Sequence, residues 1–121
     1  MIIIETIDHI SLSVSDIDKS IEFYRENFGF DLTDHASGSP EAYLQVADIK
    51  LRLFREESGK VAKTGGYVAF YVDEEDFEDA IDEIEENELE IVSGPEAVRN
   101  GKKVVISDPD GNKIALCCSS K

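Results

Sequence analysis

Residues 7–29 read IDHISLSVSDIDKSIEFYRENFG, and this stretch carries the first evidence for the fold. In residues 7–14 every second side chain from Ile10 onward is apolar, which predicts a strand with one face on the core and one polar face. In residues 16–28 apolar side chains recur every three or four positions, which predicts an amphipathic helix. Gly29 is placed to end that helix.

The start of this helix allows two caps. Ser15 and Asp18 have the spacing of a capping box, and Asp16 is an alternative N-cap. Short strands are then predicted at residues 30–35, 42–46 and 49–54, with a tight turn at Ala47-Asp48 between the last two.

The same pattern restarts after a polar, glycine-containing segment at residues 56–65, which we interpret as a linker. The second pass predicts a strand at 67–72, a helix at 74–87 and strands at 89–92, 102–107 and 113–117. The last two strands are joined by DPDGN at residues 108–112. This is a hairpin turn signal rather than a calcium loop, because the spaced carboxylates of such a loop are absent.

The order strand, helix, strand, strand, strand therefore occurs twice, and an internal repeat decides the fold class. Each half is too small to bury its own sheet face alone. We predict an α+β fold in one domain, residues 1–121, made of two tandem βαβββ modules at 7–55 and 66–118. Their curved mixed sheet would surround a cleft, with the helices outside.

Charge and composition exclude several classes of partner. The formal net charge is −15, which argues against nucleic acid and against anionic membrane surfaces. Twelve acids and no base lie within residues 73–90, and we interpret this run as a solvated helix face. The longest apolar run, residues 1–4, is too short for a membrane span or a signal peptide, so we expect a cytoplasmic protein.

The two cysteines of the chain, Cys117 and Cys118, are adjacent in the sequence. Neighbouring residues rarely meet disulfide geometry, and free thiols fit a reducing compartment. Because neighbouring strand residues point to opposite faces, we do not expect the two thiols to bind a metal together.

Two segments resemble a known family. DHISLSVSDIDKSIEFYRENFGF at residues 8–30 looks like the opening of the vicinal oxygen chelate superfamily, the glyoxalase, bleomycin-resistance and extradiol dioxygenase group. DPDGNKIAL at residues 108–116 looks like its closing segment. The resemblance covers nearly the whole chain and implies paired βαβββ modules around a cleft.

In metal-dependent members the resemblance implies one ligand from the first and one from the fourth strand of each module. Here the first position is His9, which matches. The second is Arg52, the third is Tyr67 and the fourth is Ala115. Arginine offers no lone pair and alanine offers no donor, whereas a catalytic metal needs about three protein ligands. We therefore expect a degenerate metal site, no bound metal and no cofactor.

The expected ligand-binding residues line the cleft, and each has two interpretations. His9 is a general base or a family remnant, Arg52 clamps a carboxylate or sits in an internal salt bridge, and Tyr67 and Tyr71 stack on a ligand or pack. His35 is read as a surface residue. The predicted ligand-binding set is His9, Ser11, Lys50, Arg52, Phe54, Tyr67, Ala69 and Tyr71.

These observations predict a metal-free small-molecule binding protein like the drug-sequestering branch of the superfamily. The alternative is a glyoxalase- or dioxygenase-like enzyme, a lyase, isomerase or transferase, with an atypical site. We expect a small ligand with an aromatic part and an acidic group near Arg52. The apolar residues 1–4 favour a homodimer, because exposure of an apolar run to water is unfavourable. We assign no catalytic residue.

Overall fold

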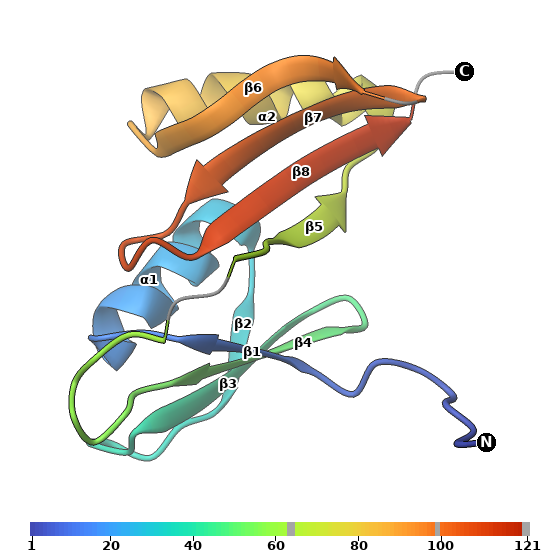
Figure 1. Cartoon of the computed structure of the whole chain (residues 1–121). Helices are drawn as coiled ribbons and strands as arrows, with labels where there is room; N and C mark the ends of the chain where they lie inside the picture. Colours follow the sequence, from blue (N-terminus) through green and yellow to red (C-terminus); the bar gives the residue numbers. More distant parts are fainter. Residues whose placement is uncertain (63–64, 99, 120–121) are drawn as a thin grey trace. The chain divides into compact units, whose positions relative to one another are not determined.

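The chain folds as two copies of one strand–helix–strand–strand–strand order, which confirms the predicted fold class (Figure 1). The computed structural model describes residues 1–62, 65–98 and 100–119. Residues 1–62 and 63–121 form two compact units. The first unit contains β1 (Ile10–Ser13), α1 (Ile17–Phe28), β2 (Asp31–Asp34), β3 (Glu41–Val46) and β4 (Ile49–Phe54). The second contains β5 (Val68–Tyr71), α2 (Glu74–Glu86), β6 (Glu90–Val98), β7 (Gly101–Ser107) and β8 (Lys113–Ser119).

Helix α1 begins and ends through side-chain and backbone caps. Asp16 is extended, and its carboxylate accepts a hydrogen bond from the Lys19 amide at 3.1 Å. The alternative N-cap is therefore confirmed and the Ser15 capping box is wrong. Gly29 adopts a left-handed conformation at φ +72°, and its amide donates to the Arg25 carbonyl.

The sheet of the first unit has the order β1-β4-β3-β2. Strand β1 runs parallel to β4, and β4, β3 and β2 are antiparallel neighbours. Helix α1 contacts β2, β3 and β4. Leu51 and Leu53 of β4 are fully buried, as are Ala42 and Leu44 of β3. The predicted apolar face of this sheet therefore packs under the helix.

The sheet of the second unit repeats this order as β5-β8-β7-β6. Phe77, Ile81 and Ile84 form the buried stripe of α2, which contacts β8 (Figure 1). Lys102 of β7 pairs with Glu78 of α2 at 3.3 Å, so the even-numbered side of β7 faces the helix. Most other acids of α2 are exposed, which agrees with a solvated face.

Two predicted strands differ from the observed ones by four residues or more in length, and the others differ by two or fewer. The prediction of residues 7–14 is too long at its start, because β1 begins at Ile10, where pairing with Leu51 begins. The prediction of residues 89–92 is too short, because β6 continues to Val98 through Gly94 and Pro95. Proline removes a ladder donor but is tolerated on an edge strand, and β6 forms an edge of its sheet.

The DPDGN segment forms the predicted hairpin turn between β7 and β8. Asp108 is 4% exposed, and its Oδ1 accepts hydrogen bonds from the amides of Asp110 and Asn112 at 2.9 and 2.8 Å. Its Oδ2 accepts from the Asn112 side chain at 2.9 Å. The carboxylate thus closes the turn upon itself, which agrees with a structural role and not with a calcium loop.

The two cysteines lie on opposite faces of β8. Cys117 pairs across the sheet with Lys103 and is half-buried, whereas Cys118 pairs with Lys102 on the α2 side and is buried. Residues 1–9 form neither helix nor strand, and Met1, Ile2, Ile3 and Ile4 are exposed. No helix within the described ranges combines the length and the apolar character that crossing a bilayer requires.

Candidate functional site

The open face of the first unit gathers most of the predicted site residues. In β4 the side chains of Lys50, Arg52 and Phe54 point away from the helix side that Leu51 and Leu53 occupy. Ser11 is the register partner of Arg52 in the parallel pair of β1 and β4. The structure therefore brings the predicted residues of this unit to one face.

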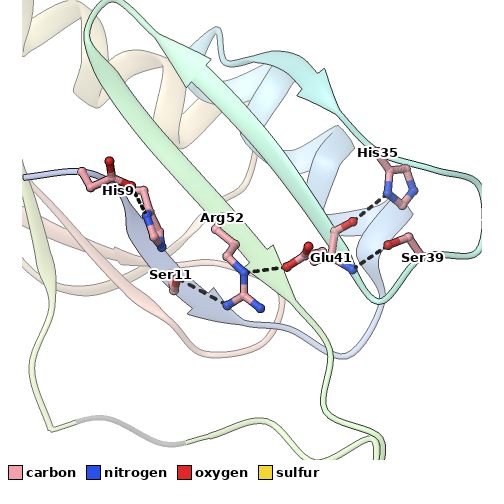
Figure 2. A network of polar contacts seen from close by, with 7 residues as sticks. His9, Ser11, His35, Ser39, Glu41 and Arg52 are labelled. Atoms are coloured by element: carbon pink, nitrogen blue, oxygen red, sulfur yellow. Dashed lines mark hydrogen bonds and ion pairs between the residues drawn. The ribbon is translucent and has the colours of Figure 1, made fainter.

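Arg52 lies at the centre of a polar network on this face (Figure 2). Its Nε donates to Glu41 Oε2 at 2.8 Å, and its Nη1 donates to Ser11 Oγ at 3.5 Å. Its guanidinium carbon lies 4.8 Å from the centroid of the Phe54 ring. The side chain is 29% exposed, so the guanidinium is partly desolvated yet reachable from solvent. The internal salt bridge considered for Arg52 therefore exists, with Glu41 as the partner.

Glu41 is itself held in place through its backbone. Its amide donates to Ser39 Oγ at 3.3 Å, and its carbonyl oxygen accepts from His35 Nδ1 at 3.0 Å. Because a carbonyl only accepts, the hydrogen of neutral His35 lies on Nδ1. The prediction of His35 as a surface residue is wrong: its side chain is 11% exposed, and its Nε2 lies 3.7 Å from Asp18 Oδ1. The loop after β2 folds back over the start of β3, and this buries the ring.

His9 is positioned by a carboxylate just before β1. Its Nδ1 lies 2.8 Å from Asp8 Oδ2, and its ring meets the Tyr43 ring edge-on with centroids 6.3 Å apart. The hydrogen bond and the charge of the His9 ring lower the pKa of Asp8, and Lys50 adds to the effect. In neutral His9 this contact assigns the hydrogen to Nδ1 and leaves Nε2 as an acceptor.

A pocket adjoins this histidine. It has a volume of about 200 Å³ and is lined by residues 6–10 together with Asp48, Ile49 and Lys50. A second hollow of about 340 Å³ lies on the other side of Lys50, against Tyr43 and Gln45. A larger hollow of about 680 Å³ lies between α1 and β2, lined by Asp18, Glu22 and Glu26. We place the candidate site at the His9 pocket, because the larger hollow lies on the helix side and meets the network of Figure 2 at His35, not at Arg52.

The open face of the second unit carries the remaining predicted residues. Ala69 and Tyr71 of β5 are register partners of Ala115 and Cys117 in β8. The Tyr67 hydroxyl accepts a hydrogen bond from Lys103 Nζ at 3.3 Å, and that ammonium lies 5.2 Å from the centroid of the Tyr67 ring. Tyr67 and Tyr71 are both exposed within their unit.

The matched family positions do not fit a metal ion in this chain. The registers of the two units correspond, since Ser11 pairs with Arg52 as Ala69 pairs with Ala115, which supports the assignment of the four positions. Arg52 is a cation already bound to a carboxylate, and Ala115 is fully buried and has no donor atom. In residues 1–62, 65–98 and 100–119 no three His, Cys, Asp or Glu side chains group as a metal site. His9 is thus the single expected ligand of the four, and we derive no step through a metal.

Sequence reasoning missed Glu41, Tyr43 and Lys103, and it misread His35 as a surface residue. A register argument identifies two of them, because a two-residue turn pairs Val46 with Ile49 and then places Tyr43 opposite Arg52, with Glu41 on the diagonal. The same argument at the second hairpin places Lys103 opposite Cys117. No sequence signal predicts burial of His35.

Comparison with known proteins gives consistent matches. The family model described as the glyoxalase/bleomycin resistance protein/dioxygenase superfamily matches residues 6–116. The chain is 35% identical over 117 residues to metallothiol transferase FosB of Staphylococcus epidermidis, covering 93% of this chain and 81% of that protein. It is 32% identical over 117 residues to glutathione transferase FosA of Serratia marcescens, covering 93% and 80%.

Solved structures agree with the fold. The fosfomycin resistance protein FosX of Listeria monocytogenes superimposes with a TM-score of 0.81 at 19% identity, covering 98% of this chain and 96% of that chain. A glyoxalase/dioxygenase of Nostoc punctiforme gives 0.79 at 27% identity, covering 96% and 92%. The prediction of a metal-free binding protein is wrong, because the curated relatives are named as transferases, that is, as enzymes. The findings favour the alternative, an enzyme with an atypical site.

Proposed function

We propose, on the premise that this chain belongs to the glyoxalase/bleomycin resistance protein/dioxygenase superfamily, that it transfers a low-molecular-weight thiol to a small electrophile. The names of two relatives support this activity, since one is a metallothiol transferase and the other a glutathione transferase. Fold alone does not fix function, so the chemistry of the open faces has to support the proposal.

The contact of Asp8 with His9 at 2.8 Å is the observation that carries the proposal. A thiol becomes a strong nucleophile when a base removes its proton. Asp8 leaves Nε2 of neutral His9 as the acceptor for that proton. The sulfur then forms a bond to carbon of a strained electrophile such as an epoxide, the carbon–oxygen bond opens, and the released oxygen takes a proton from protonated His9, which restores the neutral base. The product is a hydroxy thioether, and no oxidant or reductant is required.

The rest of the open faces would bind and orient the substrates. Arg52 offers its guanidinium fork to an acidic group, and charge-assisted hydrogen bonds of this kind contribute roughly 1.5–3 kcal/mol each. Aromatic rings on both units offer stacking surfaces. The proposed ligand-binding residues are His9, Ser11, Lys50, Arg52 and Phe54 in the first unit and Tyr67, Ala69 and Tyr71 in the second.

The proposal includes a degenerate metal site. The donor chemistry at Arg52 and Ala115 supports this, because neither side chain supplies a lone pair. Here a cation of the protein, the Arg52 guanidinium, stands at a position where metal-dependent members carry a ligand. In this chain the positive charge that binds an acidic group would come from the Arg52 guanidinium and not from a metal ion.

A turnover assay tests the function. The purified chain is incubated with L-cysteine or glutathione and with fosfomycin, the compound in the names of the FosX structures, and the adduct is measured by mass spectrometry. We expect adduct formation, a fall of about 10²-fold or more for His9→Gln, and a smaller fall for Asp8→Asn. Glu57→Gln, an exposed charge change beyond β4, serves as the control.

Parallel reactions with added manganese and with a chelator separate the two parts of the proposal. Adduct formation that survives the chelator supports the degenerate site. Adduct formation abolished by the chelator leaves the transferase activity standing and overturns the degenerate site. An absence of adduct in every reaction, or equal rates for wild type and His9→Gln, overturns the transferase with His9 as base.

We also propose that the two modules, 7–55 and 66–118, work as one domain and that the chain is a homodimer. The exposed apolar side chains of Met1, Ile2, Ile3 and Ile4 support a self-association surface. Light scattering at high micromolar concentration tests this, and a monomer mass contradicts it.

A further inference from the structure

The Arg52–Glu41 pair has binding capacity left on both of its partners. A guanidinium has five N–H groups, and the contacts within the described residues use Nε and, at the long distance of 3.5 Å, Nη1. Glu41 uses Oε2 for Arg52, and its side chain is 41% exposed. A ligand on the open face therefore meets a donor fork and a carboxylate oxygen next to each other.

The charges of the pair decide which ligand gains most from it. A lone carboxylate about 4 Å from the guanidinium lies about 6 Å from the Glu41 carboxylate, and Coulomb energy falls as the inverse of distance. Repulsion then cancels about two thirds of the attraction. A lone ammonium near Glu41 is opposed by Arg52 in the same way. A ligand with both charges makes two attractive contacts at once.

We infer that Glu41 and Arg52 together recognise a zwitterionic α-amino acid head group, with the ligand carboxylate on Arg52 and the ligand ammonium on Glu41. This rests on the proposed function for the identity of the ligand, which is the thiol co-substrate. The co-substrate class is thus a small thiol whose sulfur lies close to a free α-amino carboxylate, as in L-cysteine.

His9 lies close to this pair along the chain. It comes directly before β1, two residues from Ser11, and Ser11 is the register partner of Arg52. In L-cysteine the sulfur is three bonds from the carboxylate carbon, so a thiol bound through its carboxylate on Arg52 keeps its sulfur near that residue.

The backbone of Glu41 is held before any ligand arrives. Ser39 binds its amide and His35 binds its carbonyl, so the carboxylate projects from a fixed point at the start of β3 (Figure 2). A fixed carboxylate loses little conformational entropy on binding. His35 and Ser39 therefore act as positioning residues for the head-group site.

Binding of unreactive analogues tests the inference without requiring turnover. We would titrate three thioethers by calorimetry: S-methyl-L-cysteine with both charges, 3-(methylthio)propionate with the carboxylate alone, and 2-(methylthio)ethylamine with the ammonium alone. The inference expects S-methyl-L-cysteine to bind about tenfold or more tightly than either singly charged analogue. Equal affinities, or no binding of S-methyl-L-cysteine at millimolar concentration, would overturn it.

Two variants assign the effect to the pair. Glu41→Gln keeps the size of the side chain and removes its charge, so it should weaken S-methyl-L-cysteine about fivefold or more and strengthen 3-(methylthio)propionate. Arg52→Gln should weaken both. The controls Glu57→Gln and Lys60→Gln remove one exposed charge of each sign beyond β4 and should keep the wild-type order. Circular dichroism confirms folding of each variant, and a Glu41→Gln variant that weakens all three analogues equally contradicts the inference.

Failure of the inference and failure of the proposed function give different results. Turnover with fosfomycin that is equally fast for L-cysteine, cysteamine and 3-mercaptopropionate would overturn the head-group site and leave the transferase standing. Selective binding of S-methyl-L-cysteine with no turnover for any thiol would support the head-group site and overturn the transferase.

Discussion

Removal of the Asp108 carboxylate should destabilise the second unit by about 3 kcal/mol. Asp108→Ala deletes the acceptor of three hydrogen bonds, from the amides of Asp110 and Asn112 and from the Asn112 side chain. A hydrogen bond to a charged group contributes roughly 1.5–3 kcal/mol, so three independent ones would exceed 4.5 kcal/mol. Asp108 is buried but its partners Asp110 and Asn112 are half-buried, so water replaces part of the loss and reduces the sum to about 3 kcal/mol.

Urea unfolding followed by far-UV circular dichroism measures this free energy. A loss of this size lowers the melting temperature by about 10 °C in a chain of this length. Asn112→Ala removes the side-chain donor alone and should cost about 1 kcal/mol. Glu57→Gln serves as the surface control and should change stability by less than about 0.5 kcal/mol. An Asp108→Ala variant within about 0.5 kcal/mol of wild type would refute the argument that this carboxylate closes the hairpin.

The remaining predictions concern the His9 pair, a close backbone approach and the metal positions. The pKa of Asp8, measured by NMR titration, should lie below its ordinary value of about 3.9 and return toward it in His9→Ala. Because the pKa of Asp8 is lowered in the folded state, the stabilisation by this pair is present above the unfolded-state pKa. It is lost as the pH falls through the folded-state pKa. An unchanged Asp8 titration in His9→Ala contradicts this prediction. Gly101→Ala should destabilise the chain by about 2 kcal/mol or more in urea unfolding, because a Cβ there overlaps the Cys118 carbonyl. Gly65→Ala is the control, since a Cβ at Gly65 meets open space. Equal stabilities of the two variants would show that β7 and β8 tolerate the extra atom. Elemental analysis after loading with nickel, zinc, iron or manganese should find no stoichiometric metal in wild type, because Arg52 and Ala115 supply no donor atom; a wild-type metal lost on His9→Ala would prove the degenerate site wrong.

The elements that depend on local patterns were predictable from sequence. The apolar stripe and Gly29 define α1 because they act within one or two helical turns. The period-two alternation in residues 49–54 defines β4 with the correct bounds. The wrong details are those where tertiary context decides. Pro95 reads as a loop residue, yet β7 supplies enough pairing to carry β6 past it.

The candidate site was predictable in its faces and not in its contacts. Alternation places Arg52 on the open side, but its partner Glu41 depends on hairpin register, and the burial of His35 depends on how the loop after β2 folds. The donor set at the four metal positions is a property of residue type, so it was readable from sequence. The enzyme class was not, because an arginine at a ligand position describes what a site lacks and not what it catalyses.

The opposite orientation of the two adjacent cysteines has a practical consequence for spectroscopy. Cys117 lies half-buried on the open side of β8, and Cys118 is buried under α2. A maleimide dye or spin label added to the folded chain should therefore attach first at Cys117. The wild-type sequence thus supplies its own reporter position on the proposed substrate face, without any engineered cysteine. A ligand bound at this face would slow the labelling of Cys117.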